Sequence, residues 1–368
     1  MDYCISDECA DGIGLKAFLI LNGKESSLIK DVMKNDCLLN ATKEVFLRKE
    51  PHVRILNRLA SLITLAVEQN NENITKFCIF LYDFLPYCSE FLIFNLYFVI
   101  LKNDSSLMHL QKCLVINSIP DYISRYLMKN EVNDDETIIS LIKIIITGLN
   151  NKVIGNSFCT DNLFIVIDIL LSKNISVYVK NILWDLISSI SNEYTLVRIE
   201  NYTEKAISII SDVYENLHKY HIFIIEYISK LIQLKSSVIN PWINDQFLQV
   251  FIRLMEQFNN STNLLGSIFR LINDLLKSEY ALITLVNLLP YISYKASLFD
   301  KNALNAFSND FLISLSQRKI AKNLQGEIKK IDLYQEYLKY YLNEYKKKRK
   351  LPYGDSSSIT SSPYIYCF

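Results

Sequence analysis

The sequence predicts an all-α protein, a HEAT- or armadillo-like α-solenoid of antiparallel helix pairs. Apolar residues recur at three- and four-residue spacing from residue 26 to residue 350, and no strand-like alternation lasts beyond five residues. Similar helix pairs of about 40 residues follow one another, which is typical of such arrays. Gly and Pro are scarce, 8 and 7 of 368 residues, so few turns need a special backbone. Each pair would bury its apolar stripe against its neighbours.

The clearest helix pair lies at residues 107–129, LMHLQKCLVINSIPDYISRYLMK. Ser118 is expected to cap the second helix, with Asp121 completing a capping box. Pro120 would stand in the first turn, where its missing N–H costs nothing. The inward stripe of the two helices is predicted to consist of Leu107, Leu110, Leu114, Ile119, Ile123 and Leu127.

The remaining helices follow in order along the chain. We expect them at residues 15–22, 26–35, 38–49, 51–69, 74–85, 88–101, 137–149, 163–171, 177–191, 203–218, 221–234, 241–258, 263–276, 281–289, 290–298 and 303–316. Proline is expected to open helices at positions 86, 120, 241 and 290. A long charged helix at 324–350 would close the array. Its predicted inward line is Ile328, Ile331, Tyr334, Leu338 and Leu342.

Three segments describe the domain organisation. Residues 1–14 are acidic and expected to be frayed, and residues 15–350 are expected to form a single helical-repeat domain. Residues 351–368 contain Pro, Gly and Ser and are expected to be a disordered tail.

The stretch 77–101 is apolar enough to raise the question of a membrane span. It is interrupted by Asp83 and Glu90, so a buried repeat helix is the better interpretation.

Composition limits the partners and the compartment. Lys plus Arg and Asp plus Glu balance at 39 each, which argues against general nucleic-acid binding. Eight cysteines form no C-x-x-C pair, and the acidic start does not resemble a signal peptide. We therefore expect reduced thiols and a cytoplasmic location, with the nucleus as a second compartment.

The sequence contains few candidate catalytic residues. The four histidines, at positions 52, 109, 218 and 221, are scattered, and no nucleophile elbow or phosphate-binding loop is present. His218 and His221 could face one way on a helix, but further ligands are lacking, so a solvated helix junction is expected. We predict no catalytic, cofactor-binding or metal residues, no cofactor, and no enzymatic activity.

A basic run ends the last predicted helix. It consists of Lys346, Lys347, Lys348, Arg349 and Lys350. Five cations at a helix C-terminus suit the helix dipole, which makes a solvated helix end one interpretation. KKKRKLP also resembles a nuclear-import signal, which is the other interpretation.

Three stretches together resemble the SIT4-associated (SAPS) family, the helical-repeat regulatory subunits of type 2A-related Ser/Thr phosphatases. They are SLIKDVMKNDCLLNATKEVFLRKEPHVRILNRLASLI near the start, LQKCLVINSIPDYISRYLMK, and DLYQEYLKYYLNEYKKKRKLPYGD near the end. They cover about a quarter of the chain. The resemblance implies a non-catalytic scaffold that holds a Ser/Thr phosphatase catalytic subunit and directs it to substrates. It assigns no functional residue.

Two other interpretations stay open. The segment from Asn181 to Ser188, NILWDLIS, resembles the Trp-bearing helix of importin-α-like armadillo carriers, although the repeated Trp and Asn ladder is absent. A generic helical-repeat scaffold is the third interpretation. In each case a protein partner is expected to contact the second helices of successive pairs, including residues 120–129 and 241–258. Asp121 and Arg125 are the predicted partner-binding residues.

Overall fold

The computed structural model describes residues 13–23, 28–34, 36–48, 51–69, 72–129, 134–213, 215–298, 300–317 and 322–350. These residues form helices joined by turns, and they contain no strand. Consecutive helices pack against one another, which confirms the predicted all-α solenoid of helix pairs. The predicted disordered tail at 351–368, and all but the last two residues of the predicted frayed N-terminus, lie outside the described residues.

The chain folds into two compact units, the first made of residues 1–202 and 218–230 and the second of residues 203–217 and 231–368. The first unit contains α2 (Ile13–Leu21), α3 (Leu28–Lys34), α4 (Cys37–Phe46), α5 (Val53–Glu68), η1 (Glu72–Phe80), α6 (Leu81–Phe84), η2 (Leu85–Tyr87), α7 (Phe91–Leu101), η3 (Ser105–Leu107), α8 (Met108–Ile116), α9 (Ile119–Met128), α10 (Asp135–Leu149), η4 (Gly155–Phe158), α11 (Asp161–Ser172), α12 (Val177–Ile190), α13 (Leu196–Ile199), η5 (Glu200–Tyr202) and most of α15 (Lys219–Gln233). That residues 15–350 form a single domain stays a prediction.

The second unit contains α14 (Thr203–Ser211), the end of α15, η6 (Ser237–Ile239), α16 (Asp245–Gln257), α17 (Thr262–Leu276), α18 (Ala281–Ser297), α19 (Ala303–Gln317), α20 (Lys322–Ile328), α21 (Asp332–Glu336), η7 (Tyr337–Tyr341) and α22 (Leu342–Lys350). Residues 337–341 form one turn of π-helix inside the last helix.

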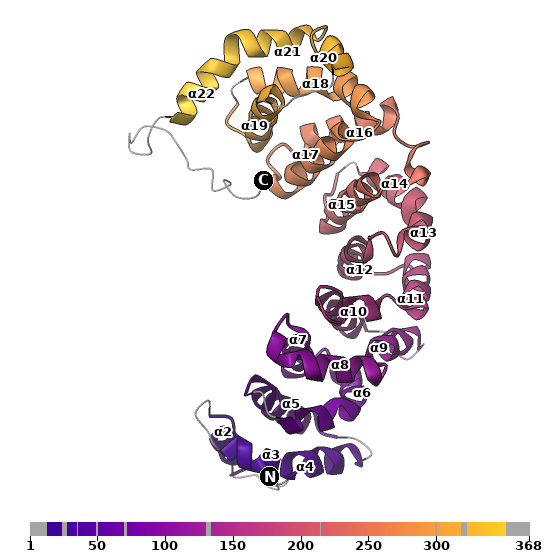
Figure 1. The fold of residues 1–368 in the computed structure, drawn as a ribbon, viewed down its shortest axis with the longest axis vertical. Helices are drawn as coiled ribbons and strands as arrows, with labels where there is room; N and C mark the ends of the chain where they lie inside the picture. The colour runs from indigo at the N-terminus through magenta and orange to yellow at the C-terminus, as the bar shows by residue number, and fades with distance from the viewer. Residues whose placement is uncertain are drawn as a thin grey trace. The chain divides into compact units, whose positions relative to one another are not determined.

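Within each unit the helices stack in rows (Figure 1). In the first unit α5, α7, α10 and α12 pack on one another in succession, and α9 packs on α11. In the second unit α16 packs on α14 and α18, and α17 packs on α19. The cores lie where neighbouring helices meet, and their largest fully buried side chains include Trp184, Phe84, Phe158 and Phe251.

The helix pair at residues 107–129 forms as predicted, except at its corner. The first five residues of the expected stripe are buried, whereas Leu127 is half-exposed. Ser118 adopts the left-handed conformation, with φ of 56°, and its side chain makes no capping hydrogen bond, so the predicted capping box is wrong. A capping side chain needs an extended backbone to reach the first N–H groups. Asn117 instead closes α8 by donating from Nδ2 to the carbonyl of Cys113 at 2.8 Å.

Several predicted boundaries move for local reasons. Residues 281–297 form one helix with Pro290 inside it, although that ring removes an internal hydrogen bond. Packing of α18 against α16, α19 and α21 holds the helix continuous. Pro241 precedes α16 instead of opening it, because Asn244 caps the helix by accepting from the N–H of Phe247 at 3.0 Å.

Other segments are shorter or tighter than expected. The helix predicted at 203–218 ends at Ser211, and most of the one predicted at 74–85 is the 3₁₀ segment η1. The closing helix is interrupted after Ile328, and Tyr337 joins Tyr334 among its buried residues.

Within the described ranges, every helix is too short or too polar to cross a membrane. The apolar stretch 77–101 is divided among η1, α6, η2 and α7, in agreement with the predicted repeat helices.

Hydrogen bonds that involve at least one polar side chain join equivalent positions of successive repeats, and we call these contacts the inter-repeat ties. They include Asp36–Lys76, Asp121–Asn162, Asn181–Tyr220, Gln233–Asp274, Asn240–Tyr280 and Asp245–Asn287. The partners lie 39 to 42 residues apart in sequence. The ties therefore mark the repeat period of about 40 residues that the sequence suggested.

Truncation of the buried stripe should destabilise the array locally. We expect Leu114→Ala or Ile123→Ala to lower the free energy of unfolding by about 2–5 kcal/mol, because each change leaves a cavity in a packed interface. Ile116→Ala is the matched control, since Ile116 is 78% exposed. Hydrogen exchange should show lost protection near α8, α9 and α11. Equal loss of protection in every helix would contradict the prediction.

Candidate protein-interaction surfaces

Asp121 and Arg125, the predicted partner-binding residues, lie together on α9. Arg125 Nε is 2.9 Å from Asp121 Oδ2, and the other carboxylate oxygen of Asp121 accepts from Asn162 Nδ2 of α11 at 2.8 Å. The Asp121 side chain is 31% exposed and that of Arg125 52%. Asp121 therefore serves the packing of α9 on α11, and Arg125 is the more accessible of the two to a partner.

The basic run continues the last helix. Lys346 and Lys347 belong to α22, and Lys347 is exposed. The side chains of Lys348, Arg349 and Lys350 lie outside the described part of the structure. The solvated helix end and the nuclear-import signal both stay predictions.

His218 and His221 open α15, and His221 is buried, so the expected solvated junction is wrong for this residue. The N–H of His218 donates to His221 Nδ1 at 3.0 Å, and the N–H of His221 donates to the carbonyl of His218 at 3.1 Å. The first of these bonds is one half of a capping box, with His in the place of Glu, and the second joins two backbone groups. Burial, aided by the neighbouring His218, lowers the pKa of His221 to about 4. Within the described ranges no three His, Cys, Asp or Glu side chains are grouped as metal ligands.

Trp184, on which the importin-like interpretation depends, is a core residue. It is almost fully buried in α12, and its ring centre lies 5.9 Å from that of Tyr227. Asn181 Oδ1 accepts from the backbone N–H of Tyr220 at 2.8 Å. Neither side chain is therefore placed to stack on a bound peptide.

A cluster of four charged side chains spans α12 and α15. It consists of Asp185, Lys219, Glu226 and Lys230. Burial raises the pKa of Asp185, and Lys219 partly offsets that effect. Burial likewise lowers the pKa of Lys230, whose Nζ donates to the carbonyl of Ser188 at 2.5 Å. The cluster holds α15 against α12, and its charges balance.

An exposed aromatic surface lies on α7, a helix of the packed row α5, α7, α10 and α12. Phe91 is 75% exposed and Phe98 49% exposed, with half-exposed Phe94 between them at helical spacing. We call these three residues the aromatic stripe. Exposed Arg54 on α5 and Lys143 on α10 belong to the neighbouring helices of the row. An exposed apolar surface of this kind is typical of a protein-binding site.

Sequence reasoning missed the aromatic stripe, although a signal was present. Helix α7, FLIFNLYFVIL, is apolar on every side, and such a helix is usually buried all round. Its Ile93, Leu96 and Ile100 fill the core, so the stripe is an apolar face beyond what the fold uses.

Burial separates the described cysteines into reactive and unreactive surroundings, and the reduced state of the thiols stays a prediction. The described cysteines, at positions 37, 78, 88, 113 and 159, are all free. Burial raises the pKa of Cys78 and of Cys88 to about 12. Because the thiolate is the reactive form, these two side chains behave as core residues.

A scan of protein-family models finds no match to the sequence, and a comparison with curated proteins finds none either.

The tie between Asp121 and Asn162 should contribute measurably to stability. In a double-mutant cycle of Asp121→Ala and Asn162→Ala, we expect a coupling free energy of about 0.5–1.5 kcal/mol, because the two groups share a partly buried hydrogen bond. Lys301→Ala combined with Asn162→Ala is the control and should be additive, because Lys301 is an exposed residue of the other unit. Urea unfolding measures each variant, and additivity in the first cycle would remove the structural role of Asp121.

Acid should destabilise the protein through His221. The folded-state pKa of about 4 lies below the ordinary value of 6.5, so the unfolded chain binds the proton more readily. This residue's stabilisation is present above about pH 6.5 and is lost as the pH falls towards 4, by up to about 3 kcal/mol. Gln can accept the same capping hydrogen bond without titrating.

The variant His221→Gln should therefore unfold with a weaker dependence on pH between 6.5 and 4 than the parent protein. His109→Gln, at an exposed position, should leave that dependence unchanged. Thermal unfolding across this pH range compares the three proteins. Identical pH profiles for the parent and His221→Gln would contradict the assignment.

Proposed function

We propose that this protein is a non-catalytic scaffold that binds another protein through the aromatic stripe of α7. The supporting observation is the exposure of Phe91 and Phe98 on a helix whose opposite side is fully packed. Water contact with two phenyl rings is unfavourable, and a partner surface that covers them would recover that free energy. Aromatic side chains are also enriched among the residues that dominate protein interfaces.

The polar groups of the chain support the same proposal. His52 caps α5 by accepting from the N–H of Arg54, and His221 caps α15. Asp121 and Asn162 tie two repeats together. These side chains are occupied by the fold, whereas catalysis needs convergent groups held in a pocket.

The partner that we propose is the catalytic subunit of a type 2A-related Ser/Thr phosphatase, which the scaffold would direct to substrates. The support is the resemblance of three stretches to the SAPS family, two of which contribute to α5, α8 and α9. The aromatic stripe lies on α7, which packs on α5. A generic protein scaffold is the alternative. An importin-like adaptor is less favoured, because Trp184 is buried.

Replacement of the stripe should weaken partner binding and leave the fold intact. We expect Phe91→Ser combined with Phe98→Ser to weaken binding of the purified phosphatase catalytic subunit by at least about tenfold, since hot-spot aromatics contribute about 2 kcal/mol or more. The control is Tyr194→Ser, because Tyr194 is 89% exposed in a turn. Calorimetry measures binding, and thermal unfolding confirms the fold.

Three outcomes separate the levels of the proposal. If the parent protein does not bind the phosphatase subunit, the phosphatase assignment is wrong. If a different purified partner binds and is lost in the double variant, the scaffold proposal still holds. Hydrolysis of a phosphoester by the purified chain would overturn the non-catalytic assignment.

A further inference from the structure

Helix α18 presents an apolar face to solvent in the second unit. Leu282, Val286 and Tyr294 are 46%, 51% and 48% exposed, and half-exposed Pro290 lies between the last two at the same four-residue spacing. We call these four residues the α18 stripe. Side chains four residues apart are neighbours on a helix surface, so the stripe runs along one side of the helix. The buried side of α18 packs on α16, α17 and α19.

Charge is almost absent from this helix. Lys295 is the one charged residue among the 17 of α18, and its Nζ lies 3.4 Å from Glu256 Oε1 of α16. The same ammonium group lies 5.4 Å from the ring centre of Tyr291 and 5.7 Å from that of Tyr294. The cation of α18 is therefore engaged by its neighbours, and the stripe offers apolar contact to whatever covers it.

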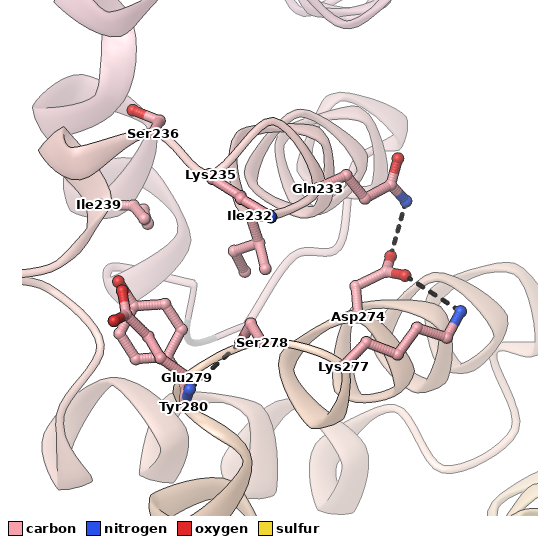
Figure 2. A pocket seen from close by; sticks show the side chains of 10 residues that line it. All are labelled: Ile232, Gln233, Lys235, Ser236, Ile239, Asp274, Lys277, Ser278, Glu279 and Tyr280. Carbon is pink, nitrogen blue, oxygen red and sulfur yellow. Dashed lines mark hydrogen bonds and ion pairs between the residues drawn. The ribbon is translucent and has the colours of Figure 1, made fainter.

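The start of α18 is held at the corner that Figure 2 shows. Ser278 Oγ accepts from the N–H of Tyr280 at 3.2 Å, and the hydroxyl of Tyr280 donates to Asn240 Oδ1 of the preceding repeat. Across the same pocket, Gln233 Nε2 donates to Asp274 Oδ2 at 2.8 Å. These bonds fix the corner from which α18 starts, so a docking segment meets a surface that is already formed.

The segment that follows α22, outside the described residues, fits the α18 stripe in length and composition. Residues 363–368, PYIYCF, are apolar or aromatic and uncharged, and residues 351–362 before them contain one charge, Asp355. Residues 351–362 can span at most about 40 Å. Segment η7 packs on α18, and the 9 residues of α22 add about 14 Å of helix. Residues 363–368 are therefore within reach of the stripe.

We propose that residues 363–368 dock on the α18 stripe of the same chain, with residues 351–362 as the linker. The aromatic and aliphatic side chains of the segment cover those of the stripe, and both surfaces leave water. Because neither the segment nor the stripe carries a charge, no ionic group loses its hydration.

Attachment to the same chain favours this occupant over a separate protein, because the linker raises the local concentration of the segment. The docked segment acts as a cover that keeps the α18 stripe from other proteins. This contact is separate from the aromatic stripe of α7 and does not depend on the proposed function.

The test uses the whole chain and its own Cys367. Val286→Cys adds a thiol to the α18 stripe, and Leu282→Cys adds one a turn earlier. Glu204→Cys, at an exposed position of α14 in the same unit, is the control. After oxidation with diamide, mass spectrometry of the digested protein measures the disulfide between the introduced cysteine and Cys367. We expect it to form at least about tenfold faster in the two stripe variants than in the control, because docking raises the local concentration. Equal rates would overturn the proposal.

Changes in the segment itself separate docking from chance collision. In the Val286→Cys background, Ile365→Ser combined with Phe368→Ser should lower the cross-linking rate to that of the control, because the docking contacts are lost. Ile359→Ser, the same kind of change in the linker, should leave the rate unchanged. A rate that persists in the double variant would contradict docking. Cross-linked dimers whose yield rises with protein concentration would place the segment on a second copy and overturn the intramolecular contact.

Discussion

The fold depends on burial that successive repeats share. In the described helices, the apolar stripes are covered by neighbouring repeats as well as within each pair. Helix α10 shows this constraint most clearly, because it packs on α7 on one side and on α12 on the other. The inter-repeat ties add polar contacts between equivalent positions of successive repeats.

Helical periodicity was enough to predict the fold class and the buried stripe of the pair at 107–129. Local chemistry at the corners was less predictable, because tertiary packing decided it. Ser118 has the residue type of a cap but is left-handed, and Pro290 is held inside a helix by its neighbours. The 40-residue period was visible only as weak similarity, whereas the ties display it directly.

The candidate sites could be predicted less well than the fold. Asp121 was chosen as a polar residue on a helix surface, yet its carboxylate is occupied by Asn162 of the next repeat. The two residues are 41 positions apart in the sequence, so a local sequence pattern cannot predict their hydrogen bond. The aromatic stripe was missed for a different reason. Its apolar residues were expected to be buried in the core, and only the packing shows which phenylalanines remain exposed.

The inter-repeat ties also give the array a chemical polarity. In most of those named above, the acceptor belongs to the earlier repeat and the donor to the later one, as in Asp36–Lys76, Asp121–Asn162 and Asp245–Asn287. A cut between two repeats therefore creates two unlike ends, one rich in acceptors and one rich in donors. Such ends would match each other head to tail, whereas two copies of the same end would place like groups together. Engineered truncations or fusions of this protein should respect that direction, because a reversed junction would leave carboxylates facing carboxylates.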